Sequence, residues 1–141
     1  MPGETMRLVA PAKLTLSLRV TGVRADGYHE IDAVMTTASE PFDVVEIVPA
    51  ERMSIEIAGP FAAGVPTDET NLVWKAAKAL WTAAGRAGEP KDAHIKLEKT
   101  IPHEAGLGGG SADAAGALAA LNTIWELRMS TKELHKVAAT I

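Results

Sequence analysis

The residues best suited to chemistry lie in a glycine-rich segment at positions 106–111, which reads Gly-Leu-Gly-Gly-Gly-Ser. Each glycine loses backbone entropy when it is ordered, so such a run is useful where bare amides must approach a ligand closely. An alanine-rich stretch at residues 111–127 follows and predicts a helix. The first amides of a helix have no internal acceptor and lie at the positive end of its dipole. This junction therefore favours an anion, and phosphate above all.

Two familiar phosphate motifs do not describe this segment. No lysine follows Gly110, which excludes a Walker A loop. If Gly106 and Gly108 are the first two glycines of a dinucleotide fingerprint, Ser111 stands where the third belongs. Ser111 can instead offer its hydroxyl to a phosphate or to a magnesium-bound water. The alternative interpretation is structural, in that the glycines only let a strand reverse into a helix.

Two other positions can contribute to a site. Lys13 lies at the start of an alternating segment and can project over the end of a sheet. Tyr28 and His29 follow a turn at Asp26-Gly27, where an aromatic ring and an imidazole can hold a flat ligand by stacking and hydrogen bonding. Taken singly, the lysine is more typical of a solvated strand end and the Tyr-His pair of a surface turn. The four histidines have no ligand-like spacing, so we predict no histidine metal site.

Composition limits the class of protein. The chain has 141 residues, 47% hydrophobic and 23% charged, which fits one globular domain. A net charge of −4 gives no reason to expect a nucleic-acid partner. The absence of cysteine excludes disulfides and thiolate metal sites and suits a reducing cytoplasm. Neither a signal peptide nor an apolar run of about 20 residues is present, so we expect a cytoplasmic protein without a membrane partner.

Periodicity predicts strands followed by helices. Alternating apolar residues favour strands at positions 14–20, 31–38, 43–48, 53–58 and 94–98, with a hairpin connection at 49–52. A helix is expected near residues 72–83, capped by Thr67 or Asp68 and stopped by Gly85. Strands in succession and then helices predict an α+β fold.

The last helix begins with a capping box at Ser130 and Glu133. We expect it to run to Ile141 without a stop signal and interpret the chain as cut short. A natural carboxy-terminal helix is the alternative.

Several segments together resemble a known family. They are Pro-Ala-Lys-Leu at 11–14, Arg-Ala-Asp-Gly-Tyr-His-Glu at 24–30, Asn-Leu at 71–72 and the run at 106–115. The chain resembles, over nearly its whole length, the 4-diphosphocytidyl-2-C-methyl-D-erythritol kinases. These belong to the superfamily of galactokinase, homoserine kinase, mevalonate kinase and phosphomevalonate kinase (GHMP kinases). The resemblance implies that residues 1–141 form the amino-terminal, ATP-binding domain of a GHMP kinase. Such a domain is similar to domain 2 of ribosomal protein S5 and has a mixed or antiparallel sheet with helices on one face.

The resemblance also implies a reaction, in which the γ-phosphate of ATP passes with Mg²⁺ to the 2-hydroxyl of 4-diphosphocytidyl-2-C-methyl-D-erythritol. This step belongs to the non-mevalonate route to isoprenoids. By resemblance, Lys13 is catalytic, and Asp26, Tyr28 and His29 bind the cytidine-containing substrate. The residues implied for ATP are Asn71, Lys99, Pro102, His103, Glu104, Ala105, Gly106, Leu107, Gly108, Gly109, Gly110, Ser111 and Ala112.

Three departures from the family pattern matter. Thr15 replaces an asparagine, and Glu104 brings a carboxylate near the expected phosphates. The family's catalytic aspartate lies in a Gly-x-Asp-Val-Pro segment beyond the last helix, and the chain ends before it, so we expect no efficient catalysis from these residues alone. A non-catalytic nucleotide-binding or interaction module, and another kinase of the superfamily, are the alternatives. We also expect an exposed apolar edge that favours association or leaves the chain marginally stable, while the oligomeric state is not predicted.

Overall fold

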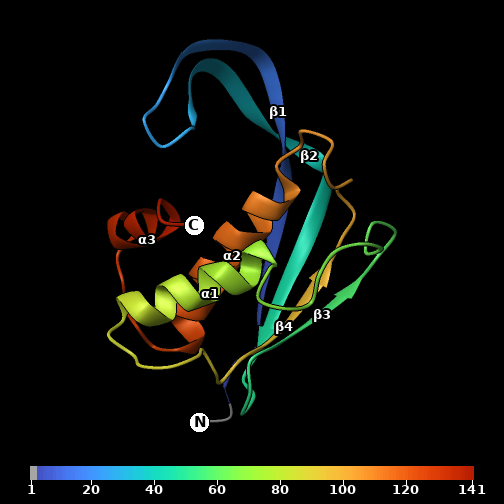
Figure 1. The fold of residues 1–141 in the computed structure, drawn as a ribbon. Helices are drawn as coiled ribbons and strands as arrows, with labels where there is room; N and C mark the ends of the chain where they lie inside the picture. The colour runs from blue at the N-terminus through green and yellow to red at the C-terminus, as the bar shows by residue number, and fades with distance from the viewer. Residues whose placement is uncertain (1–2) are drawn as a thin grey trace.

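The computed structural model describes residues 3–141 and shows a four-stranded sheet with helices packed against it (Figure 1). The elements are β1 (Met6–Val23), β2 (His29–Val48), β3 (Ser54–Ala58), α1 (Leu72–Ala83), β4 (His94–Glu98), α2 (Gly109–Ile124) and α3 (Thr131–Ala138). The strand order is β1-β2-β4-β3. Strand β2 is antiparallel to both neighbours, whereas β3 and β4 are parallel. The resemblance implied a mixed or antiparallel sheet, and the sheet is mixed. Within residues 3–141, no helix has the length and apolar character needed to cross a membrane.

The core lies between the sheet and the helices, which cover one of its faces (Figure 1). Apolar side chains of β2 and β4, such as Ile47 and Ile95, are fully buried with Leu80 of α1 and Leu121 of α2. Trp81 and Trp125 meet edge to face, with ring centroids 5.0 Å apart. The indole N–H groups donate to backbone carbonyls, so both tryptophans are satisfied core residues.

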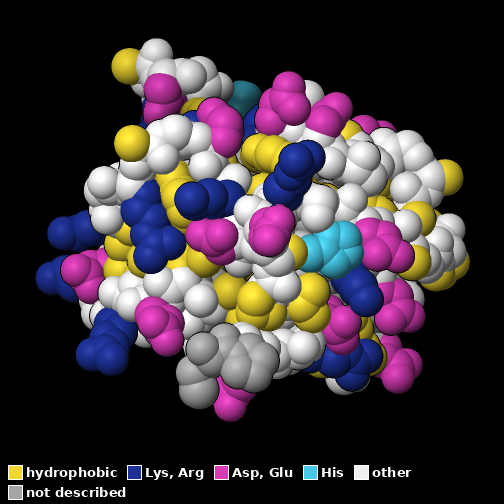
Figure 2. Space-filling view, turned by 90° about the horizontal axis from the view of Figure 1, so that it is seen from below, with side chains coloured by type: hydrophobic (Ala, Val, Ile, Leu, Met, Phe, Trp, Pro, Cys, Tyr) yellow, Lys and Arg dark blue, Asp and Glu magenta, His cyan; other side chains and the backbone are white. Residues whose placement is uncertain are grey.

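Strands β1 and β2 extend beyond the rest of the sheet as a two-stranded arm, which curls over at the top of Figure 1. Of the residues of β2, only the last five, Val44 to Val48, pair with β4. The arm therefore has no third strand. Leu16 and Val20 on it are 66% and 55% exposed. The exposed apolar surface that we expected is therefore on this arm, and association through it stays a prediction. From the opposite end of the molecule, charges of both signs are interspersed among apolar side chains (Figure 2).

Two strand predictions were wrong in their connections. Residues 31–38 and 43–48 belong to one strand, because β1 pairs with both segments. Pro11 lies opposite Phe42 and Lys13 opposite Thr37, with a register shift between them. Residues 49–52 do not form a hairpin, because β4 is inserted between β2 and β3. Ile95 and Leu97 of β4 pair with β2 on one side and β3 on the other, and both side chains are buried in this central position.

The helix ends also differ from expectation. Asn71, not Thr67 or Asp68, caps α1, and its side chain accepts a bond from the Val73 amide at 2.8 Å. Gly85 follows the helix with φ 77°, as the stop signal predicted. Helix α2 begins at Gly109 and ends at Ile124, earlier at both ends than predicted. Helix α3 has the predicted capping box but ends at Ala138.

Candidate functional site

The glycine loop leads into α2 with the geometry that an anion site requires. Gly106 and Gly108 have φ of 73° and 67°, a left-handed conformation that side chains disfavour. The amide of Ala112 donates to the Gly108 carbonyl at 2.9 Å. The amides of Gly109, Gly110 and Ser111 come before this bond and so have no acceptor within the helix. They form the positive end of the dipole of a 16-residue helix, and the Ser111 side chain there is exposed.

Lys13 lies directly against this loop. Its amide donates to the Leu107 carbonyl at 2.7 Å, next to the register shift in β1. A Cβ on Gly108 would lie 3.4 Å from Lys13 Cβ and 3.5 Å from its Cε. The lysine side chain therefore runs along Gly108, and its ammonium group can add positive charge near the free amides.

A cavity of about 250 Å³ lies beside the loop. The wall includes five of the residues predicted for ATP, namely Asn71, Lys99, His103, Glu104 and Gly110. The amide of Asn71 is already engaged, because it caps α1 and donates to the Pro66 carbonyl at 2.8 Å. Asn71 thus shapes the cavity more than it offers a free polar group. Glu104 is exposed with φ 58°.

Lys99 is buried between two carboxylates, which the sequence did not predict. Its Nζ lies 2.5 Å from Asp43 Oδ2 and 2.6 Å from Asp113 Oδ2, and the lysine is only 3% exposed. Burial acts to lower the pKa of Lys99, but the hydrogen bonds that its ammonium donates to Asp113 and Asp43 outweigh burial and hold that pKa above its usual range. Burial, with the nearby Asp43 carboxyl, raises the pKa of Asp113 to about 7. Asp43 and Asp113 were not assigned as site residues, and the only sequence signal was a charge inside an apolar stretch.

The predicted substrate residues lie elsewhere, at the turn that closes the arm. Asp26 accepts from the Tyr28 amide at 3.0 Å and pairs with Arg24 at 2.6 Å. The Arg24 guanidinium lies 5.9 Å from the centre of the Tyr28 ring, and Tyr28 is 68% exposed. His29 begins β2. In Figure 1 this turn lies apart from the loop before α2, so the structure does not bring the two groups together.

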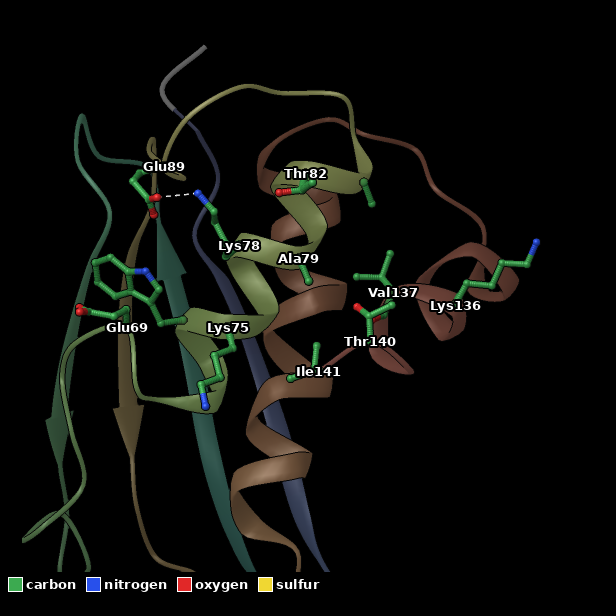
Figure 3. Close-up of a pocket in the computed structure, with 12 residues that line it drawn as sticks. Glu69, Lys75, Lys78, Ala79, Thr82, Glu89, Lys136, Val137, Thr140 and Ile141 are labelled. Carbon is green, nitrogen blue, oxygen red and sulfur yellow. Dashed lines mark hydrogen bonds and ion pairs between the residues drawn. The ribbon is translucent and has the colours of Figure 1, made fainter. Parts of the chain in front are cut away.

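A larger cavity, of about 1030 Å³, lies between α1 and α3 (Figure 3). It contains none of the predicted site residues, and its walls include Trp74, Val137, Ile141 and the Lys78–Glu89 ion pair of 2.6 Å. Within residues 3–141, no three histidine or acidic side chains gather as a metal site would require. The glycine loop therefore stays the candidate site.

Comparison with known proteins agrees with this geometry. The 4-diphosphocytidyl-2-C-methyl-D-erythritol kinase of Jannaschia sp. (strain CCS1) is 50% identical over 127 residues, covering 90% of this chain and 43% of the relative. The enzyme of the same name from Rhodococcus jostii is 44% identical over 132 residues, covering 94% and 41%. The chain thus spans less than half the length of these relatives.

Solved structures show the same fold. A crystal structure of 4-(cytidine 5′-diphospho)-2C-methyl-D-erythritol kinase superposes with a TM-score of 0.71 at 37% identity, covering 96% of this chain and 45% of that one. Homoserine kinase from Cytophaga hutchinsonii has a TM-score of 0.70 at 23% identity, covering 95% and 39%, which is a likeness of fold alone. The family described as the GHMP kinases N terminal domain matches residues 71–141. Because that match takes in half of the chain, with α1, the glycine loop and α2, the chain belongs to the GHMP kinases.

Proposed function

We propose that this chain is the ATP-binding domain of a kinase that phosphorylates the 2-hydroxyl of 4-diphosphocytidyl-2-C-methyl-D-erythritol. The observation that carries the proposal is the set of three free amides, at Gly109, Gly110 and Ser111, with Lys13 packed against the preceding glycine. The names of the similar proteins support the choice of substrate.

These residues suit phosphoryl transfer because that reaction depends mainly on positioning and on neutralising charge. The free amides and the dipole of α2 would hold phosphate oxygens, and Lys13 would add a cation where negative charge develops. Mg²⁺ would enter with the nucleotide, since it keeps several waters and takes phosphate oxygens as ligands. The exposed Ser111 hydroxyl fits a contact to that hydration shell. The cavity beside Asn71 would take the adenosine.

The cytidine part of the substrate is proposed to meet the turn of the arm, where the Tyr28 ring is open for stacking. Asp26 fixes the conformation of this turn by accepting the Tyr28 amide. His29 supplies an imidazole beside it. We propose the complete reaction for an enzyme with the full length of the relatives.

Calorimetric titration with Mg²⁺ and a non-hydrolysable ATP analogue tests the proposal. We expect the parent chain to bind and Gly109→Val to lose binding, because its added side chain would press on Ile101, 3.0 Å from the new Cβ. Circular dichroism establishes that the variant is folded. Lys78→Met removes an exposed ion pair away from the loop and should bind like the parent. No binding by a folded parent, or equal binding by Gly109→Val, would overturn the proposal.

A further inference from the structure

A buried ionic cluster ties the two ends of the glycine loop together. Lys99 bridges Asp43 of β2 and Asp113 of α2 at 2.5 and 2.6 Å. The other oxygen of Asp43 accepts the amides of Thr100 and Ile101, both at 2.8 Å. Those amides lie where the chain leaves β4 and enters the loop. The cluster therefore holds the start of the loop through Asp43 and its end through Asp113.

The cluster also touches the loop at a glycine whose amide is free. A Cβ on Gly109 would lie 3.5 Å from Asp43 Oδ2 and 3.0 Å from Ile101 Cγ2. Ile101 is fully buried, and its own amide is one of the two that Asp43 holds. A shift of the cluster would consequently move the backbone that presents the phosphate-binding amides.

The charge of the cluster is unbalanced, because two carboxyl groups share one buried ammonium. Asp113 is 2% exposed, and within residues 3–141 its Oδ1 has no hydrogen-bond partner. The charged group in contact with Asp113 is Lys99, which also contacts Asp43. His103 and Glu104 of the loop line the same cavity of about 250 Å³ as Asp113. The pKa of Asp113 is raised to about 7 by burial and by Asp43, so its charge changes near neutral pH.

We propose that the Asp43–Lys99–Asp113 cluster positions the phosphate loop, and that Asp113 takes up a proton when a nucleoside triphosphate binds. The second part rests on the proposed function. An anion at the loop makes a further negative charge behind it more costly, so the bound state favours the neutral acid. The proton comes from the solvent and forms the O–H bond of the Asp113 carboxyl group. Lys99 then acts as a positioning residue, because its ammonium is held by the carboxylates of Asp43 and Asp113.

Calorimetry in buffers of different ionisation enthalpy measures this proton. If binding raises the pKa of Asp113 by about one unit, about 0.4 proton is taken up at pH 7 and affinity falls up to about tenfold between pH 6 and pH 8.5. Asp113→Asn keeps an acceptor for Lys99 but has no proton to exchange. Subtracting the proton uptake of Asp113→Asn from that of the parent removes the contribution of the nucleotide's own protonation. Lys78→Met should take up as many protons as the parent. Equal proton uptake by the parent and Asp113→Asn would overturn the coupling.

Hydrogen exchange without nucleotide tests the positioning separately. The amides of Ile101, Lys13 and Ala112 report on the loop, because they donate to Asp43, Leu107 and Gly108. In Lys99→Met we expect these amides to exchange at least about tenfold faster relative to those of α1, and Lys78→Met to leave them unchanged. If Lys99→Met does not fold, Asp113→Asn serves instead. In the parent we expect the protection of the loop amides to fall from pH 6 to pH 8.5 as Asp113 loses its proton, and Asp113→Asn should abolish this fall.

Unchanged loop protection in the folded variants would overturn the positioning role. If the exchange pattern is as expected but the parent binds no nucleotide, the positioning role stands and the proposed function fails. The two failures are therefore distinguishable.

Discussion

Gly109→Ala is expected to destabilise the protein, although alanine is the better helix former. The new Cβ would lie 3.0 Å from Ile101 Cγ2, 3.1 Å from Ile101 Cβ and 3.5 Å from Asp43 Oδ2. Ile101 cannot swing aside, because its Cβ is fixed to the backbone and the residue is fully buried. Overpacking of this kind costs about 1–3 kcal/mol, and replacing a helical glycine by alanine returns about 0.5–1 kcal/mol. The net loss in free energy of unfolding should lie between about 0 and 2.5 kcal/mol, centred on about 1 kcal/mol.

Gly110→Ala is the matched control, one residue further along the same first turn. Its Cβ would meet only Leu72 Cδ1, at 3.4 Å. That atom is the end of a flexible side chain on a residue that is 37% exposed, so it can move. We expect this variant to be unchanged or more stable by up to about 1 kcal/mol.

Urea unfolding followed by tryptophan fluorescence measures both variants, since Trp81 and Trp125 are buried in the core. The two free energies of unfolding should differ by about 2 kcal/mol, with unchanged dependence on denaturant. Equal midpoints for the two variants would refute the reasoning, because the packing of Gly109 on Ile101 would then carry no energetic weight.

Four further changes test other parts of the molecule. Trp81→Ala should cost about 3–5 kcal/mol in urea unfolding, because it removes a large buried ring and its contact with Trp125. Ser130→Ala should cost about 0.5–2 kcal/mol in thermal unfolding through loss of the capping box of α3. Because the pKa of Asp113 is raised to about 7 in the fold, its protonated form stabilises the fold, and that stability is lost as pH rises through 7. Because of this group, the free energy of unfolding should be about 1.4 kcal/mol larger at pH 6 than at pH 8.5. Asp113→Asn should remove this difference. Leu16→Ser should reduce any self-association seen by light scattering, because it removes an apolar side chain exposed on the arm.

The features that the sequence predicted well are local ones. The presence of a helix after the glycine loop depends on consecutive glycines followed by helix formers, although α2 begins two residues before the predicted Ser111. The capping box at Ser130 and Glu133 lies within one turn. Gly85 ends α1 through its own backbone conformation. In each case the interacting groups are within a few residues of one another, so propensity and spacing are sufficient.

The choice of the α1 cap could not be predicted in the same way. Thr67, Asp68 and Asn71 are all good capping residues, and the sequence offers them within five positions. The structure selects Asn71, whose amide group also donates to the Pro66 carbonyl and so fixes the loop before the helix. Asp68 is used one turn earlier, where it accepts bonds from the amide and hydroxyl of Thr70.

The error in strand order is what concealed the ionic cluster. A hairpin of β2 with β3 would leave Asp43 far from the end of β4. In the structure Val44 pairs with Glu98, so one step further along this antiparallel register Asp43 faces Lys99. These residues are 56 positions apart in the chain, and only the insertion of β4 beside β2 brings a carboxylate and an ammonium together at the entrance to the loop. Removing one partner of a buried ion pair costs about 3–5 kcal/mol, so the cluster also opposes any slip in the register of these two strands. The register that closes the sheet therefore also fixes the position of the phosphate loop.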